Sequence, residues 1–99
     1  MEGWKNMKIE HVDGKKNGSV MLYALSTCVW CKMTKKLLTE LGVAFDYSFV
    51  DLLHGAEQEE AIMELKRVNP SGSFPTLVVN GNAIVGYQEA RIREAFKNG

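Results

Sequence analysis

An uninterrupted apolar segment, VMLYAL at residues 20–25, constrains the fold of this chain more than any other feature. Its length and its lack of alternation are those of a strand buried on both faces of a sheet. It leads through STCVWC, residues 26–31, into apolar residues at helical spacing up to about Leu41. Ser26 or Thr27 is expected to cap this helix, and Gly42 to end it. The segment therefore predicts a buried strand that runs into a helix with two cysteines at its start.

The rest of the chain alternates between strand and helix patterns. The expected elements are a strand at 44–50, a helix at 56–68, hairpin strands at 76–79 and 83–86 around Asn-Gly-Asn, and a helix at about 88–97. Two strands joined through a helix should be parallel, with a right-handed crossover.

These elements predict an α/β fold with a central mixed four-stranded sheet and three flanking helices. The domain is expected to span residues 19–99. Residues 1–18 are expected to form an N-terminal extension, in which residues 8–12 can add an edge strand to the sheet.

Charge and hydropathy narrow the classes of function. Twelve basic and twelve acidic residues cancel, which gives no indication of a nucleic-acid or membrane partner. The chain contains no run apolar enough to span a bilayer, and MEGWKNMKIE at its start does not resemble a signal peptide. We therefore expect a cytoplasmic protein, in which disulfides are usually transient or catalytic.

Cys28 and Cys31 are the only cysteines, and four interpretations of the pair arise. A structural disulfide is disfavoured because its loop is too small to constrain the unfolded chain much. A second interpretation, that both cysteines are ordinary core residues, stays open, since cysteine is among the most buried residue types. A zinc site usually takes four ligands, and only His11, His54 and scattered carboxylates offer more donors. A metal or cluster shared between two chains also stays open.

The fourth interpretation, a redox pair, is favoured by the position of the cysteines between a strand and a helix. At a helix N-terminus, unpaired backbone N–H groups and the helix dipole stabilise a thiolate, which is the nucleophilic form. Cys28 is therefore expected to attack a target disulfide. Cys31, one turn later, is expected to resolve the mixed disulfide. Lys32 and Lys35 add positive charge nearby.

A second candidate feature is SFPT, residues 73–76. Pro75 opens a strand after a Gly/Ser-rich loop, which fits an edge strand or a cis peptide bond. The backbone of Phe74 can then pair with an extended substrate peptide, although a plain loop-ending proline remains the alternative. Trp30 lies on the apolar stripe of the helix, so it either packs in the core or offers a flat surface beside the sulfurs.

TCVWC after VMLYALS, then SFPTLVVNG, then IVGYQEARIREAF resemble the glutaredoxins and glutaredoxin-like redoxins of the thioredoxin superfamily. The resemblance runs from about Ser19 to Phe96, in the family's order and spacing. It implies a thioredoxin-like fold, a cis Pro75 that faces the disulfide, and dithiol–disulfide exchange with protein or glutathione disulfides. The substrate-binding residues that it implies are Thr27, Val29, Trp30, Phe74, Pro75, Gly86 and Tyr87.

Several positions depart from the family's pattern. Val29 stands in place of the CPYC proline, and Leu25 in place of a lysine that binds a glutathione carboxylate. Tyr87 follows Gly86 where the family has a second glycine, and Glu89 is only a near match for the acidic residue that holds the γ-glutamyl group. The chain therefore looks more like redoxins that serve ribonucleotide reductase or related enzymes and are recharged by a thioredoxin-type reductase.

The resulting expectation is a monomeric thiol–disulfide oxidoreductase that reduces protein disulfides. Its redox centre is the Cys28–Cys31 pair, with no other cofactor, and its electron donor is a disulfide reductase or glutathione. A rival within the same class is glutathione-dependent deglutathionylation by Cys28 alone. A rival of another class is a metal- or iron–sulfur-cluster-binding module that uses the two cysteines.

Overall fold

The computed structural model describes residues 9–16 and 18–97. Most of the expected N-terminal extension, including Trp4 and Lys8, lies outside the described residues, and the domain boundary at residue 19 stays a prediction. Within the described ranges no helix is long and apolar enough to cross a membrane.

Residues 9–16 and 18–97 form a mixed sheet with three α-helices, as the sequence predicts. In chain order the elements are β1 (Glu10–Val12), β2 (Val20–Ala24), α1 (Val29–Glu40), β3 (Phe45–Phe49), the short 3₁₀ helix η2 (Val50–Leu52), α2 (Gly55–Val68), β4 (Thr76–Val79), β5 (Asn82–Val85) and α3 (Glu89–Ala95). The observed bounds differ from the predicted ones by one or two residues at most ends, which is the usual uncertainty of helix and strand termini.

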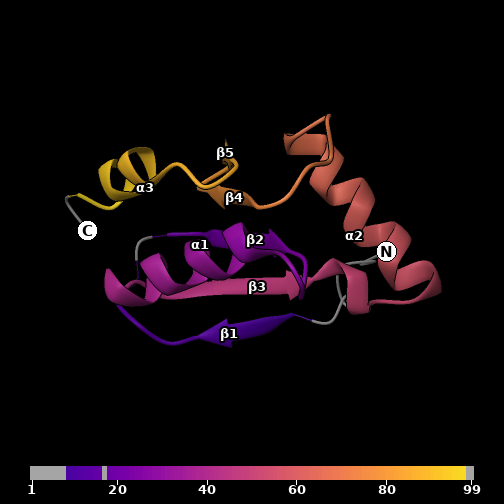
Figure 1. Cartoon of the computed structure of the whole chain (residues 1–99), viewed down its shortest axis with the longest axis horizontal. Helices are drawn as coiled ribbons and strands as arrows, with labels where there is room; N and C mark the ends of the chain where they lie inside the picture. The colour runs from indigo at the N-terminus through magenta and orange to yellow at the C-terminus, as the bar shows by residue number, and fades with distance from the viewer. Residues whose placement is uncertain (1–8, 17, 98–99) are drawn as a thin grey trace.

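The sheet has five strands in the order β1-β3-β2-β4-β5, with β1 at one edge and β5 at the other (Figure 1). As predicted, β2 and β3 are parallel, and β4 and β5 form an antiparallel hairpin. The hairpin turn consists of Asn80 and Gly81 alone, both with positive φ (51° and 87°), which is the geometry that an Asn-Gly turn supplies. β1 pairs antiparallel with β3, so the optional edge strand of the prediction is present.

Helices cover both faces of the sheet. On one face, Leu37 and Leu38 of α1 and Ile92 of α3 join a core cluster with buried residues of four strands, Leu22 and Leu77 among them. On the other face, Ala61 and Leu65 of α2 pack on Tyr23, Val50 and Leu53. The chain is thus a three-layer α/β fold of the thioredoxin-like, glutaredoxin type, with β2 in the middle of the sheet.

The buried face of α1 is not the face that apolar spacing predicts. Met33 lies on the apolar stripe but is 38% exposed, and Trp30, for which both a core and a surface position stay open from the sequence, is 58% exposed. Cys31 and Thr34 are buried instead. The Thr34 hydroxyl donates to the Trp30 carbonyl (2.8 Å), and this bond removes the usual cost of burying a hydroxyl. In α3, Ala95 is exposed, whereas Ile92 and Phe96 are buried.

His11 and Asp46 face each other across the β1–β3 pair. His11 Nδ1 lies 2.6 Å from Asp46 Oδ1, and His11 Nε2 lies 3.1 Å from Asp13 Oδ1. The hydrogen bond with Asp46 is the largest of the effects that raise the pKa of His11 above 6.5. A raised folded-state pKa means that this contact stabilises the fold below pH 6.5 and that the stabilisation is lost as the pH rises through the folded-state pKa.

Replacing Asp46 with Asn should therefore destabilise the protein more at pH 5.5 than at pH 8.5, because the charge-assisted bond exists only while His11 is protonated. Urea unfolding midpoints at the two pH values measure the difference. Glu64→Gln is the matched control, since Glu64 pairs with Arg67, which stays charged throughout. A midpoint loss for Asp46→Asn that is the same at both pH values would contradict the assignment.

Candidate active site

The turn between β2 and α1 is held by a carboxylate from the segment that follows β3. Asp51, in η2, accepts hydrogen bonds from the Ser26 backbone N–H (2.8 Å) and from the Ser26 hydroxyl (2.5 Å). These bonds, the hydroxyl bond foremost, hold the pKa of Asp51 below its usual value. No sequence pattern predicts this contact, because Asp51 lies in a short polar connection 25 positions after Ser26. The contact between Asp51 and Ser26 fixes the backbone immediately before the cysteines.

Cys28 is the N-cap of α1, so the prediction that Ser26 or Thr27 caps the helix is wrong. Its Sγ accepts the backbone N–H of Cys31 at 3.2 Å, in the position where a serine or threonine oxygen would usually lie. Ser26 is occupied instead by Asp51. A backbone donor at the positive end of the helix dipole is thus aimed at the sulfur of Cys28.

Cys31 lies one turn into α1 and is only 1% exposed. Its Sγ accepts the backbone N–H of Leu25, the residue that ends the buried apolar run, at 3.4 Å. Burial raises the pKa of the Cys31 thiol to about 12, and the hydrogen bond with Cys28 and the charges of Cys28 and Asp51 act in the same direction. Both cysteines are present as free thiols, with Cys28 the more accessible one. The pair therefore combines a reachable sulfur with a protected one.

Pro75 lies next to this pair because of strand register. Tyr23 of β2 pairs with Thr76 of β4, so the same register continued by one residue brings Pro75 level with Ala24, at the end of β2. The Phe74–Pro75 peptide bond is cis, as the resemblance implies. Phe74 and Cys28 pack against the same core cluster. The structure thus brings the two sequence features, TCVWC and SFPT, to one end of the sheet.

The loop before Pro75 is organised by a buried asparagine, Asn69. Asn69 is 5% exposed. Its side-chain amide donates to the Thr76 hydroxyl (2.9 Å) and to Ser73 Oγ (3.2 Å), and its oxygen accepts from the Ser71 hydroxyl (2.7 Å). The density of Asn and Ser in NPSGS was the available signal, since these residues bond to nearby backbone and side chains in turns. Asn69 therefore holds the segment that leads to Phe74 and Pro75.

Two aromatic rings form a platform beside the cysteines. The rings of Trp30 and Tyr87 stack, with centroids 5.8 Å apart and planes 21° from parallel. Of the two interpretations left open for Trp30, its 58% exposure rules out the core. Gly86, which precedes Tyr87, has φ of +82° and donates its N–H to the Pro75 carbonyl (2.8 Å). Substitution there is strained because other residues rarely adopt this φ.

The remaining predicted contact residues, Thr27 and Val29, lie on the surface at the start of α1, and Val29 is 65% exposed. The predicted residues come from three segments, the turn before α1, the loop before β4 and the segment before α3, and Cys28, Phe74 and Tyr87 pack against the same core cluster. That arrangement suits a peptide that approaches Cys28 from solvent.

Comparison with known proteins agrees with this geometry. The family model described as Glutaredoxin matches residues 20–84. The chain belongs to the glutaredoxin family. The crystal structure of the glutaredoxin from Methanosarcina mazei Go1 is 59% identical, with a TM-score of 0.82, over 88% of this chain and 85% of that one. Methanosarcina acetivorans methanoredoxin is 58% identical, with a TM-score of 0.80, over 83% and 87% of the two chains.

A curated relative extends the family assignment at lower identity. It is the glutaredoxin-like 8.6 kDa protein in the rubredoxin operon of Clostridium pasteurianum, 29% identical over 73 residues, which are 74% of this chain and 91% of the relative. The chain is thus a glutaredoxin-like redoxin similar to methanoredoxin.

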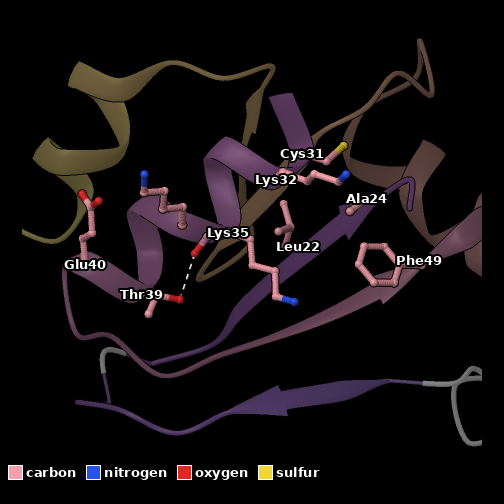
Figure 2. Close-up of a pocket in the computed structure, with 9 residues that line it drawn as sticks. Leu22, Ala24, Cys31, Lys32, Lys35, Thr39, Glu40 and Phe49 are labelled. Atoms are coloured by element: carbon pink, nitrogen blue, oxygen red, sulfur yellow. Dashed lines mark hydrogen bonds between the residues drawn. The ribbon is translucent and has the colours of Figure 1, made fainter. Parts of the chain in front are cut away.

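Figure 2 shows how the lysines of this glutaredoxin lie along α1. A cavity of about 490 Å³ lies between α1 and strands β2 and β3, with Cys31, Lys32 and Lys35 in its lining. The Nζ of Lys35 lies 4.0 Å from the centre of the Tyr47 ring and 5.6 Å from that of Phe49. The charge of Lys35 is therefore directed at the aromatic rings of β3, where a cation is stabilised by the ring faces.

The two histidines considered as metal ligands lie on other parts of this glutaredoxin. His11 is on β1 and bonds to Asp46, and His54 precedes α2. Among residues 9–16 and 18–97, no group of three or more His, Cys, Asp or Glu side chains is arranged to hold a metal ion.

The two thiols of this glutaredoxin should differ sharply in alkylation. At pH 8, iodoacetamide should modify Cys28 and leave Cys31 intact, because the thiolate is the reactive form and burial raises the pKa of Cys31 to about 12. Peptide mapping by mass spectrometry measures both sites. The control is the same reaction in urea, where both cysteines should react.

Equal labelling of both thiols in the folded protein would contradict the assignment. Protection of both thiols until a chelator is added would instead indicate a bound metal or cluster.

Proposed function

We propose that this protein is a thiol–disulfide oxidoreductase that reduces protein disulfides through Cys28 and Cys31. The observation that carries the proposal is the asymmetry of the pair: an accessible sulfur at the N-cap of α1 accepts a backbone N–H, and a buried sulfur lies one turn behind it. Family membership supports the reaction class. The pair itself is the redox unit, so the reaction needs no resident cofactor.

The reaction proceeds in two exchanges. The Cys28 thiolate attacks one sulfur of the target disulfide, a Cys28–target S–S bond forms, and the second target sulfur leaves as a thiolate and takes up a proton. Cys31 then loses its proton, and its sulfur attacks Cys28 Sγ. The Cys28–Cys31 disulfide forms and the first target sulfur leaves. The target has gained two electrons and two protons, which an external dithiol later returns to the cysteine pair.

The order of the two steps follows from the electrostatics of Cys31. Its raised pKa keeps Cys31 protonated while Cys28 is a free thiolate or thiol. Two of the causes that raise this pKa, the hydrogen bond with Cys28 and the charge of Cys28, disappear once the sulfur of Cys28 is in a mixed disulfide. Cys31 thus becomes easier to deprotonate when its attack is needed.

Three features favour a thioredoxin-type reductase over glutathione as the electron donor. Leu25 supplies no cation for a glutathione carboxylate. Tyr87 stacks on Trp30 and so occupies space beside Gly86 that a second glycine would leave open. Glu89, the near match for the acidic residue of the family, is already paired with Arg93 at 2.9 Å. In this proposal the protein works as a cytoplasmic monomer on disulfide-containing proteins.

Insulin reduction with dithiothreitol tests the assignment of the cysteines. Cys28→Ser should reduce the rate to that of dithiothreitol alone, because a serine hydroxyl cannot perform the first exchange. Cys31→Ser should accumulate a mixed disulfide between Cys28 and insulin, detected by non-reducing electrophoresis and mass spectrometry. Full activity of Cys28→Ser would refute the proposal.

The choice of electron donor is tested separately. Turnover is compared with glutathione plus glutathione reductase and with NADPH plus a thioredoxin reductase. We expect turnover with the second system. Strong glutathione-coupled reduction of a glutathione mixed disulfide that survives Cys31→Ser would favour the deglutathionylation rival, which needs Cys28 alone.

A further inference from the structure

A cavity of about 470 Å³ lies beside the candidate active site, on the α2 side of the sheet. Two of its walls come from the segments that flank the reactive cysteine. Leu25 is the residue whose carbonyl accepts the N–H of Cys28 (3.3 Å), and Phe74 immediately precedes the cis proline. The cavity therefore adjoins the path that a peptide must take to reach Cys28.

The interior of this cavity is apolar. Val50 and Leu65 form the deepest parts and are 3% and 1% exposed. Leu25, Ile62 and Phe74 are half-buried and line the sides. A half-buried apolar wall gains free energy when a ligand removes it from water, so the interior favours an apolar occupant.

The polar groups at the rim of the cavity are largely engaged in other hydrogen bonds, so they offer little to a charged ligand. Both oxygens of Asp51 accept hydrogen bonds from Ser26. Gln58 donates its side-chain amide to the Val50 carbonyl at 3.1 Å. Lys66 and Asp51 are the two charged residues of the lining, and their formal charges are opposite. The rim therefore favours a neutral occupant over an ionic one.

We propose that this cavity is a specificity pocket that receives a neutral aliphatic side chain of the protein substrate, from the residue next to the attacked cysteine. The proposal rests on the proposed disulfide exchange and deepens it by naming the substrate class. Substrates whose attacked cysteine is flanked by Leu, Ile, Val or Met are preferred over substrates with Asp or Lys at that position. Leu25 and Ile62 are the specificity-determining residues.

The test uses single-turnover reduction, which does not depend on the physiological electron donor. Peptides that differ only in the residue next to cysteine (Leu, Asp or Lys) carry thionitrobenzoate in disulfide linkage to that cysteine. Cys28 of the reduced protein attacks the peptide sulfur, thionitrobenzoate leaves as a coloured thiolate, and Cys31 then releases the peptide. The second-order rate constant is measured by stopped-flow absorbance.

We expect the Leu peptide to react about tenfold faster than the Asp and Lys peptides with the wild-type protein, the discrimination that one apolar side chain typically supplies. Leu25→Lys and Ile62→Lys each place a charge in the wall and should remove the preference for Leu. The matched control is Met63→Lys, on the same helix as Ile62 but 64% exposed and outside the cavity lining, which should keep the preference.

Hydroxyethyl disulfide, which has no amino-acid side chain, separates specificity from folding and chemistry. Its rate should be similar in the wild type and in Met63→Lys, and for Leu25→Lys and Ile62→Lys each peptide rate is divided by the rate with this reagent. Equal rates for the three peptides, or a preference for a charged one, would overturn the pocket while leaving disulfide exchange intact. A Leu preference unchanged in both Leu25→Lys and Ile62→Lys would also overturn it. Absence of reaction with every disulfide would overturn the proposed function itself.

Discussion

The antiparallel pairing of β2 with β4 is the constraint on which the rest of the site depends. Leu22 and Leu77 are cross-strand partners on the face that α1 covers, and both are almost completely buried. A one-residue slip of either strand would turn its apolar side chains to the opposite face, so core packing fixes the register. The same register sets Pro75 level with the end of β2, where the chain turns toward Cys28. The packing of two leucines thus places the proline loop against the cysteine turn.

Features that are local in the sequence were predictable. The buried strand, the cysteine-bearing helix and the Asn-Gly hairpin each follow from a periodicity or a turn residue within a few positions. The contacts that complete the site were not, because they join distant residues. Asp51 reaches Ser26 across 25 positions, and Trp30 stacks on Tyr87, which lies 57 positions later in the chain. Apolar spacing therefore left the position of Trp30 open, since a tryptophan on the inner stripe and a tryptophan in a surface stack give the same pattern.

Polar partners also decide which residues α1 can bury. Cys31 enters the core because the Leu25 N–H lies at its sulfur, and Thr34 because its hydroxyl bonds to a carbonyl one turn earlier. No buried side-chain nitrogen or oxygen of the described residues lacks a hydrogen-bond partner. These bonds satisfy the polar groups of Cys31 and Thr34 on the buried face of α1, and Trp30 lies on the exposed side of the helix. The satisfaction of buried polar groups, rather than hydrophobicity alone, thus sets the surface that a substrate meets.

Leu25 links the choice of electron donor to the choice of substrate. A lysine at this position would offer a charge to a carboxylate, whereas leucine removes that charge and adds an apolar wall to the cavity next to Cys28. One side chain cannot both bind a carboxylate and line an apolar pocket. An aliphatic occupant would remove water from an ammonium group in the wall, and that desolvation costs free energy. The loss of the glutathione-binding cation and the gain of an apolar pocket are therefore two consequences of the same residue. We therefore propose that a redoxin built in this way selects partners by the side chains around their disulfides rather than by the charge of a small thiol.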